Sequence, residues 1–372
     1  MTKVPIQDLQ RHTKSLVEPM MKVTRRIIKS GRYTMGEEVD RFELSFASYL
    51  GVKYCAGVAN GSDALELSLR AVGVKPGDKV LTVANAGMYA ANAIIATGAI
   101  PHFVDIDPVT MNMSKQSLLR TISHDHSALV VTHLYGRMAD IDSICNIARD
   151  HDVKVVEDCA QSVGSYLGDK YSGTWGLVGC FSFYPTKNLG ALGDAGAVVT
   201  NDRNIDKRIR ALRQYGWEKK YFQTHTNGRN SRMDELQAGL LTLKLPYLEN
   251  WIERRKYIVN RYRETIGNTD TKLPSDAGGA DTAHLCVLQV HNRERFRKYL
   301  EDRGVATEIH YPVLDYKQSS LANDINIELR GVPLPVSEKV LGRVVTIPCF
   351  PELTEQEIAH ISSVLSSWRK DN

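Results

Sequence analysis

The sequence predicts an α/β protein with a mostly parallel central sheet covered by helices on both faces, followed by a smaller α+β domain. The first observation is that short apolar runs alternate with segments of helical periodicity in the first half of the chain. That alternation favours parallel strands joined by crossover helices. The second is a change of pattern after Pro246, where a long charged helix leads into isolated strands. We therefore expect a large domain at residues 1–246 and a small domain at residues 247–372.

Helices are expected where apolar residues recur three or four positions apart. The clearest starts at Glu37, repeats apolar side chains at Val39, Phe42 and Phe46, and ends before Gly51. In chain order the predicted helices lie at 9–29, 37–50, 64–72, a segment ending at 96, 141–150, 203–213, 233–245, 247–266, 293–303 and 355–368.

Strands are expected where short apolar runs are bounded by turn residues, as Pro76-Gly77-Asp78 precedes the run at 79–83. In chain order they lie at 4–6 (a strand or an arm), 54–58, 79–83, 100–105, 128–133, 153–157, 180–184, 197–200, 285–290 and 306–310. Ligands of such sheets bind beyond the carboxyl ends of the strands. The residues that follow the strands are therefore the candidate site.

Composition excludes several other classes of protein. The chain has 372 residues and a net charge of +4, which is small for its length and argues against a dedicated nucleic-acid binder. Its six cysteines form no CxxC pair or Cys/His cluster, so we expect free thiols in a reducing cytoplasm and no metal. No apolar signal region or membrane-spanning stretch is present, and no membrane partner is expected.

The most informative stretch is residues 180–200, where an apolar run is followed by Pro185-Thr186-Lys187-Asn188 and then by a glycine-rich segment. A lysine on a turn between two buried strands is unusual, because lysine normally lies in solvent. At the edge of a dry cleft, desolvation would lower the pKa of its amine and make it nucleophilic. Lys187 is thus a candidate for a Schiff base with a carbonyl cofactor. The alternative is an exposed lysine in a β-turn.

Two other strand ends carry polar groups. The turn containing Gly61, Ser62 and Asp63 opens a helix, and a helix N-terminus binds phosphate well. Asp158 and Gln161 follow another strand, and a buried carboxylate needs a cationic partner, such as a protonated pyridine nitrogen. Plain helix caps at Ser62, Asp63 or Asp158 are the alternatives, and Glu157 is the rival carboxylate.

Four stretches give the chain a resemblance to a known family. They read GSDALELSLRAVGVKPGD at 61–78, VEDCAQSVGS at 156–165, SFYPTKNLGALGDAGAVVT at 182–200 and GRNSRMDELQAGLL at 228–241. In this order they resemble the DegT/DnrJ/EryC/StrS family of nucleotide-sugar aminotransferases. The resemblance covers nearly the whole chain. It implies a fold-type-I enzyme that uses pyridoxal 5'-phosphate (PLP/PMP), and a homodimer with active sites shared across its interface.

The resemblance also assigns roles to single residues. It makes Lys187 the catalytic residue and the covalent cofactor ligand, and Asp158 the partner of the pyridine nitrogen. The other implied cofactor contacts come from Gly61, Ser62, Gln161, Ser182 and, across the interface, Asn230. The family usually has a ring-stacking aromatic where this chain has Gly87, so Tyr89 is expected to supply the ring face, with ordinary packing as the alternative.

Substrate contacts are expected from two further segments. Lys219, Lys220 and Arg229 lie in a loop rich in cations and aromatics, and cations suit a nucleotide diphosphate. A solvated loop is the alternative. His310 and Tyr311 resemble the family's substrate-side HYP motif, although a packed strand end would give the same pattern.

The predicted function is transfer of an amino group from glutamate to a keto-sugar nucleotide. The run KNLGALGDAG resembles the branch that aminates C3, which favours a dTDP-3-keto-6-deoxyhexose. The alternatives are amination at C4 or another position, a PLP enzyme that makes a non-sugar amine, or a noncatalytic regulator on the same fold. A Rossmann oxidoreductase is disfavoured because no GxGxxG follows an early strand.

Overall fold

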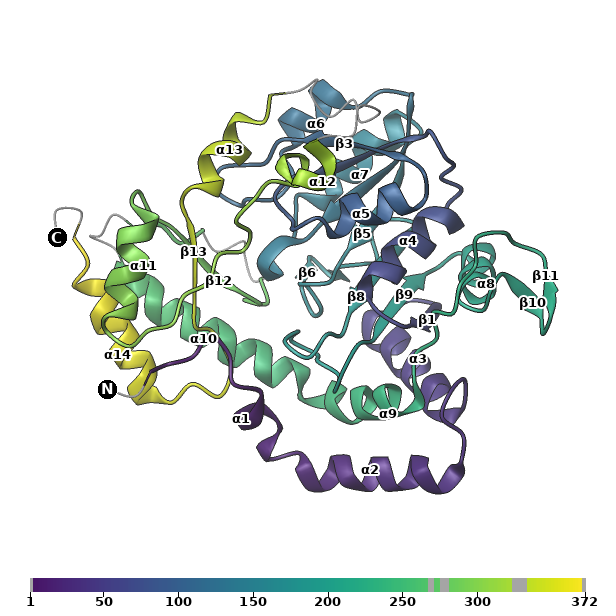
Figure 1. Ribbon diagram of the computed structural model, residues 1–372, viewed down its shortest axis with the longest axis horizontal. Helices are drawn as coiled ribbons and strands as arrows, with labels where there is room; N and C mark the ends of the chain where they lie inside the picture. The colour runs from purple at the N-terminus through teal and green to yellow at the C-terminus, as the bar shows by residue number, and fades with distance from the viewer. Residues whose placement is uncertain (1–2, 267–270, 275–280, 323–332, 370–372) are drawn as a thin grey trace.

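A seven-stranded sheet forms the centre of the larger part of the computed structural model, which describes residues 3–266, 271–274, 281–322 and 333–369 (Figure 1). The strands, in their order across the sheet, are β1 (Tyr54–Val58), β9 (Gly196–Thr200), β8 (Val178–Ser182), β5 (Lys154–Asp158), β4 (His126–Thr132), β2 (Lys79–Val83) and β3 (Ile100–Val104). From β8 to β3 all pairs are parallel, whereas β9 is antiparallel to both β8 and β1. The predicted mostly parallel sheet is confirmed.

Helices cover both faces of this sheet because successive strand residues point to opposite sides. Ala128 and Val130 of β4 pack with one group of helices, and Leu129 and Val131 pack with another. The first face carries α4 (Gly61–Ala71), α5 (Tyr89–Ala96) and α8 (Arg203–Leu212). The second face carries α3 (Glu37–Leu50), α6 (Lys115–Thr121), α7 (Ile141–Asp150) and α9 (Glu235–Lys244).

The smaller part of the molecule has a core of its own. The long helix α10 (Leu248–Ile266) runs from the end of α9 towards both chain termini (Figure 1). It packs against β12 (Cys286–Gln289), β13 (Val344–Ile347), α11 (Arg293–Glu301) and α14 (Glu355–Ser366). Other short elements are α12 (Ser319–Ala322), α13 (Pro335–Leu341), β6 (Tyr166–Leu167), β7 (Lys170–Tyr171), and the 3-10 turns at Leu134–Gly136, Leu245–Tyr247 and Asp315–Lys317. The boundary at residue 246 stays a prediction, and four segments of the small domain (267–270, 275–280, 323–332 and 370–372) lie outside the described residues.

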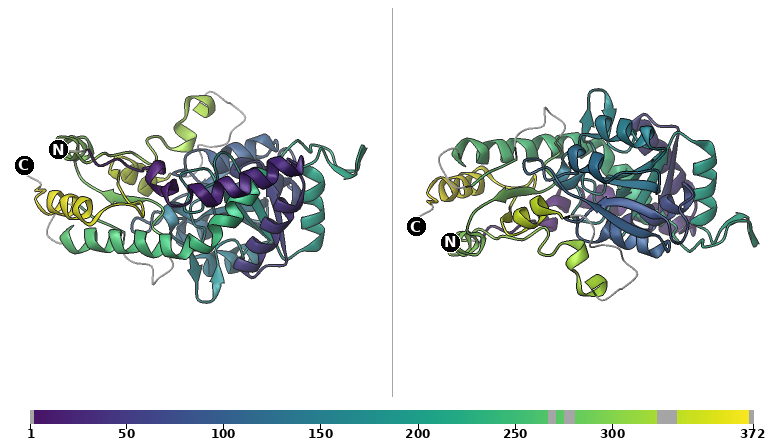
Figure 2. Two further views of the ribbon diagram at one scale, coloured as in Figure 1. Left: turned by 90° about the horizontal axis from the view of Figure 1, so that it is seen from below. Right: turned by 90° about the horizontal axis from the view of Figure 1, so that it is seen from above.

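Three expectations for local structure were wrong. The helix at 9–29 is two helices, α1 (Leu9–Lys14) and α2 (Val17–Ser30). Residues 4–6, expected to be a strand or an arm, form an arm with a single bridge from Val4 to Val305. The strand at 306–310 is a single bridge, in which Glu308 pairs with Thr346 of β13, and residues before and after Glu308 line a cavity. The loop after α8 is a hairpin of β10 (Trp217–Lys219) and β11 (Phe222–Gln223), which projects from the body of the molecule (Figure 2).

None of the helices in the described part of the chain is long and apolar enough to cross a lipid bilayer.

Candidate active site

A cavity of about 890 Å³ opens at the carboxyl ends of three neighbouring parallel strands. Thr132, Asp158 and Ser182 are the last residues of β4, β5 and β8, and all three line it. Residues 306–308, 310 and 311 of the predicted small domain line another side. Nine of the residues expected from the sequence line the cavity, namely Gly61, Ser62, Tyr89, Asp158, Gln161, Ser182, Lys187, His310 and Tyr311.

Lys187 lies on the connection between β8 and β9, which returns antiparallel without a helix. Its backbone N–H donates to the Tyr184 carbonyl at 2.8 Å, and the buried Lys244 ammonium donates to the Gly190 carbonyl at 2.7 Å. Gly190 must lack a side chain, since a Cβ there would lie 2.4 Å from the Pro185 carbonyl oxygen. Burial lowers the pKa of Lys187 to about 8, and the nearby Asp158 carboxylate opposes that shift. The amine is therefore partly neutral near physiological pH.

Asp158 is the buried carboxylate of the cavity. Its Oδ1 accepts from the Ala160 N–H at 3.1 Å, and its Oδ2 accepts from the Thr132 hydroxyl at 3.4 Å. Burial raises the pKa of Asp158, while the Ala160 N–H and the charge of Lys187 act in the opposite direction. The alternative of a helix cap does not apply, because no helix begins in the residues that follow. The rival Glu157 is fully buried but does not line the cavity.

The N-terminus of α4 forms the opposite wall. Its cap is Asn60, whose side chain accepts from the Asp63 N–H at 2.8 Å, so neither Ser62 nor Asp63 is the cap. The first N–H groups of a helix lack partners within it, and Gly61 and Ser62 bring theirs to the cavity wall. A Cβ on Gly61 would lie 2.6 Å from the Ser182 Cβ, so only glycine lets the helix start approach β8 this closely.

Tyr311 packs beside Gly87, the position where the family's aromatic is missing. A Cβ on Gly87 would lie 2.9 Å from the Tyr311 ring, and the φ of +77° also favours glycine. The Gln161 amide donates to the Tyr311 hydroxyl at 2.9 Å and accepts from the Tyr135 N–H at 2.7 Å. Tyr89 is half exposed and meets Tyr311 edge to face, with ring centroids 6.1 Å apart. Tyr89 and Tyr311 therefore both lie where the sequence predicted a ring face from Tyr89 alone.

His284 is a cavity residue that sequence reasoning missed. It is buried, and burial holds its pKa well below the usual range. The Asn188 amide donates to the Thr282 carbonyl at 3.1 Å, so its oxygen faces the His284 Nδ1 at 3.2 Å and accepts from it. The imidazole Nε2 is then left as an acceptor. A histidine directly before a predicted strand of a second domain gave no local signal of this position.

The N-terminal arm was also missed as part of the site. Lys3, Pro5, Ile6 and Gln7 line the cavity, and the Gln7 amide donates to the Thr186 carbonyl at 3.3 Å, beside Lys187. The arm is therefore attached to the lysine turn.

Four predicted contacts lie outside this cavity. Arg229 is ion-paired with Asp63, at 3.2 Å, and with Glu66. Lys219 and Lys220 lie over the rings of Phe222 and Tyr221 on the projecting hairpin, and Asn230 is exposed beside Gln214. Within one chain, these four residues therefore do not line the cavity.

The side chains present fit a pyridoxal-phosphate cofactor. A desolvated amine, a buried carboxylate and a helix start that binds anions lie around one cavity, and these are the groups that its aldehyde, pyridine nitrogen and phosphate require. The protein is a fold-type-I aminotransferase by fold and site. The model of the DegT/DnrJ/EryC1/StrS aminotransferase family matches residues 14–366, and the chain belongs to that family.

The chain is similar over nearly its whole length to relatives named as a transaminase and as a regulatory protein, and to a solved structure. A dTDP-3-amino-3,6-dideoxy-alpha-D-galactopyranose transaminase of Aneurinibacillus thermoaerophilus is 39% identical, over 98% of this chain and 99% of its own. A protein of Geobacillus stearothermophilus named pleiotropic regulatory protein is 35% identical, over 98% of both chains. The crystal structure of S. venezuelae DesV in complex with a ketimine intermediate superposes with a TM-score of 0.95 at 33% identity, covering 100% of this chain and 99% of that one.

Proposed function

We propose that this aminotransferase moves an amino group from glutamate to C3 of a dTDP-3-keto-6-deoxyhexose. The observation that carries the proposal is the partly neutral amine of Lys187, held in a cavity large enough for a sugar ring beside a cofactor. The preference for C3 is supported by the run KNLGALGDAG after the lysine and by the relative named as a dTDP-3-amino-sugar transaminase.

Each residue then has a physical task. The cofactor, when bound, supplies an electron-withdrawing ring that stabilises a carbanion. Asp158 would hold a proton on the ring nitrogen, while the amides of Gly61 and Ser62, with the Ser182 hydroxyl, would bind the phosphate. Lys187 would bind the cofactor and then move a proton to and from the reacting carbon, since its pKa of about 8 suits both uptake and release near neutral pH. Tyr89 and Tyr311 would form the wall over the ring.

The position of amination is tested with a matched pair of substrates. The protein, loaded with cofactor and glutamate, is incubated separately with the 3-keto and the 4-keto form of one dTDP-6-deoxyhexose. We expect amination of the 3-keto sugar at least about 100-fold faster in kcat/KM, as a site built to hydrogen-bond a particular substrate group discriminates this strongly. Amination of the 4-keto sugar alone would overturn the C3 assignment and favour the C4 alternative.

A second chain is proposed to complete the site, because Asn230 and the β10–β11 hairpin do not line the cavity of their own chain. Asn230→Ala should raise the dissociation constant of the cofactor about 10-fold, because it removes a hydrogen bond to a charged group of the cofactor bound in the neighbouring subunit.

The cross-subunit origin is measured with mixed dimers of Asn230→Ala and Lys187→Ala subunits. If Asn230 acts on the neighbouring site, each mixed dimer contains one site with neither defect, and tight cofactor binding with amino transfer returns. Mixed dimers without any such rescue would show that the site is not composite.

A further inference from the structure

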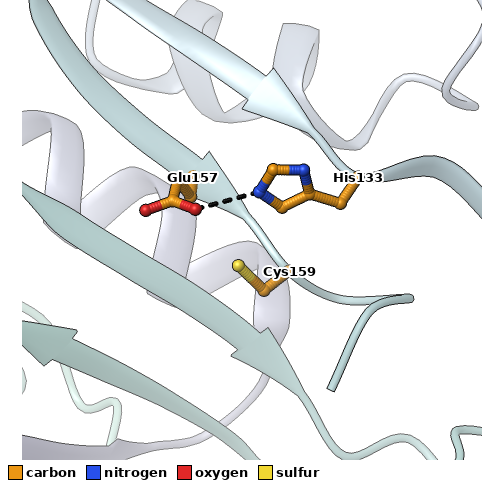
Figure 3. Close-up of side chains that lie close together, drawn as sticks. All are labelled: His133, Glu157 and Cys159. Carbon is orange, nitrogen blue, oxygen red and sulfur yellow. Dashed lines mark hydrogen bonds and ion pairs between the residues drawn. The ribbon is translucent and has the colours of Figure 1, made fainter. Parts of the chain in front are cut away.

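A buried cluster of His133, Glu157 and Cys159 lies at the ends of β4 and β5, next in sequence to Thr132 and Asp158, which line the cavity (Figure 3). Ligand atoms of the three side chains lie within 4.8 Å of one another, a spacing that a metal ion could use. Burial, however, raises the pKa of the Cys159 thiol well above its usual range, so the thiolate that a metal needs is disfavoured.

The glutamate of this cluster is already saturated with hydrogen-bond donors. Its Oε1 accepts from the N–H groups of Trp175, at 2.8 Å, and Gly176, at 2.7 Å. Its Oε2 accepts from the Gly173 N–H at 2.8 Å and lies 2.9 Å from the His133 Nε2. Four donors on two oxygens make Glu157 a firmly held carboxylate, and they leave little room for a cation.

The hydrogen bonds also fix the state of the histidine. The Ala139 N–H points to the His133 Nδ1 at 3.1 Å, so that nitrogen is the acceptor and carries no proton. The proton is then on Nε2, which donates to Glu157. His133 and Glu157 are therefore a neutral imidazole bonded to a carboxylate, both with no exposed surface.

This pair is covalently adjacent to the groups that form the cavity. His133 follows Thr132 and Glu157 precedes Asp158, on neighbouring strands β4 and β5. The His133 backbone N–H donates to the Asp158 carbonyl at 3.1 Å, and the Thr132 hydroxyl donates to the Asp158 carboxylate. Successive strand residues point to opposite faces, so Glu157 points away from the face that carries the Asp158 side chain, and its bond to His133 joins the two strand ends there.

We propose that the His133–Glu157 pair positions Asp158. The pair would hold the charged carboxylate of Asp158 in one place and orientation at the cofactor ring. The inference rests on the proposed role of Asp158. The bonds to residues 173–176 anchor the pair to the loop beneath β5, so that neither strand end can shift without breaking several buried hydrogen bonds.

The test uses Glu157→Gln beside a matched control, Glu235→Gln. Glu235 is also a buried carboxylate that accepts three backbone N–H groups, from Gly36, Glu38 and Val39, but it does not line or adjoin the cavity. In both variants an amide NH₂ must face N–H donors, so both thermal midpoints should fall by several degrees. Only Glu157→Gln should also shift the midpoint of the visible-band titration, which is the change of the bound cofactor's visible absorbance with pH. It should also raise the cofactor's dissociation constant about 10-fold.

A second pair of variants keeps the test decisive if Glu157→Gln does not fold. His133→Gln can still present an N–H to Glu157, whereas His133→Leu cannot. We expect the visible-band titration to be retained in the first and shifted in the second. The inference is wrong if His133→Leu or Glu157→Gln loses stability while the band titration and cofactor affinity stay at the wild-type values. It is equally wrong if the purified protein contains stoichiometric zinc that His133→Gln removes.

Failure of this inference can be told apart from failure of the role proposed for Asp158. If Asp158→Asn shifts the band titration and Glu157→Gln does not, only the positioning role is refuted. If Asp158→Asn itself leaves the titration unchanged, the role of Asp158 is refuted.

Discussion

Lys187→Ala is expected to reduce amino transfer by at least about 10³-fold, because the substitution removes both the nucleophile and the general base. The cofactor should still bind, since the helix start at Gly61 and the carboxylate of Asp158 are untouched. Borohydride reduction followed by denaturing mass spectrometry measures the difference directly. Wild-type protein should retain the cofactor mass on the peptide that contains Lys187, and the variant should retain none.

The matched control is Lys244→Met. Lys244 is a second buried lysine whose pKa burial lowers to about 8, but it donates to the Gly190 carbonyl and does not line the cavity. Its replacement should leave the label on Lys187. The assignment would be refuted if the cofactor label were lost in Lys244→Met and kept in Lys187→Ala. It would also be refuted if Lys187→Ala turned over at the wild-type rate.

The pH dependence of cofactor uptake gives a second check on Lys187. Only the neutral amine is nucleophilic, and burial lowers the pKa of this amine from the usual value near 10.5 to about 8. The rate at which cofactor-free protein gains visible absorbance on addition of pyridoxal phosphate should rise with pH and level off above about 8. A rate that kept rising towards pH 10 would indicate an exposed lysine.

Lys187, Asp158 and Gly61 could be singled out from the sequence as candidates by where they lie along the chain, whereas their roles came from the family resemblance. Ligands gather at the carboxyl ends of parallel strands, and these residues follow apolar runs that are recognisable as strands. The positions of the strands along the chain therefore predict which side chains lie close together in the fold. They do not predict the distances between those side chains.

Two other contributions to the cavity could not be found in this way. His284 and the N-terminal arm reach the cavity through the docking of segments far apart in the chain, which no periodicity records. Gly87 looked like a missing aromatic because its sequence neighbours do not show that Tyr311 takes the adjacent space. Arg229 looked like a free cation because Asp63 and Glu66, its partners, are distant in sequence.

Asp158→Asn is expected to lower kcat about 10²- to 10³-fold, a loss typical of removing one preorganised electrostatic contact from an active site. The two side chains have the same shape, and the Asn amide oxygen can still accept from Ala160 or Thr132. What is lost is the negative charge, which would keep a proton on the ring nitrogen of the cofactor. The fall should therefore appear in kcat, while KM for the sugar changes little.

The control for that loss is Asp105→Asn at the end of β3 in the same sheet. Asp105 is a buried carboxylate that accepts from the N–H groups of Val336 and Ser337, and it does not line the cavity. Its replacement should cost stability with little change in kcat. Equal losses of kcat in the two variants would mean that any buried carboxylate at this edge of the sheet supports activity through folding alone, and that the charge of Asp158 has no direct part in the chemistry.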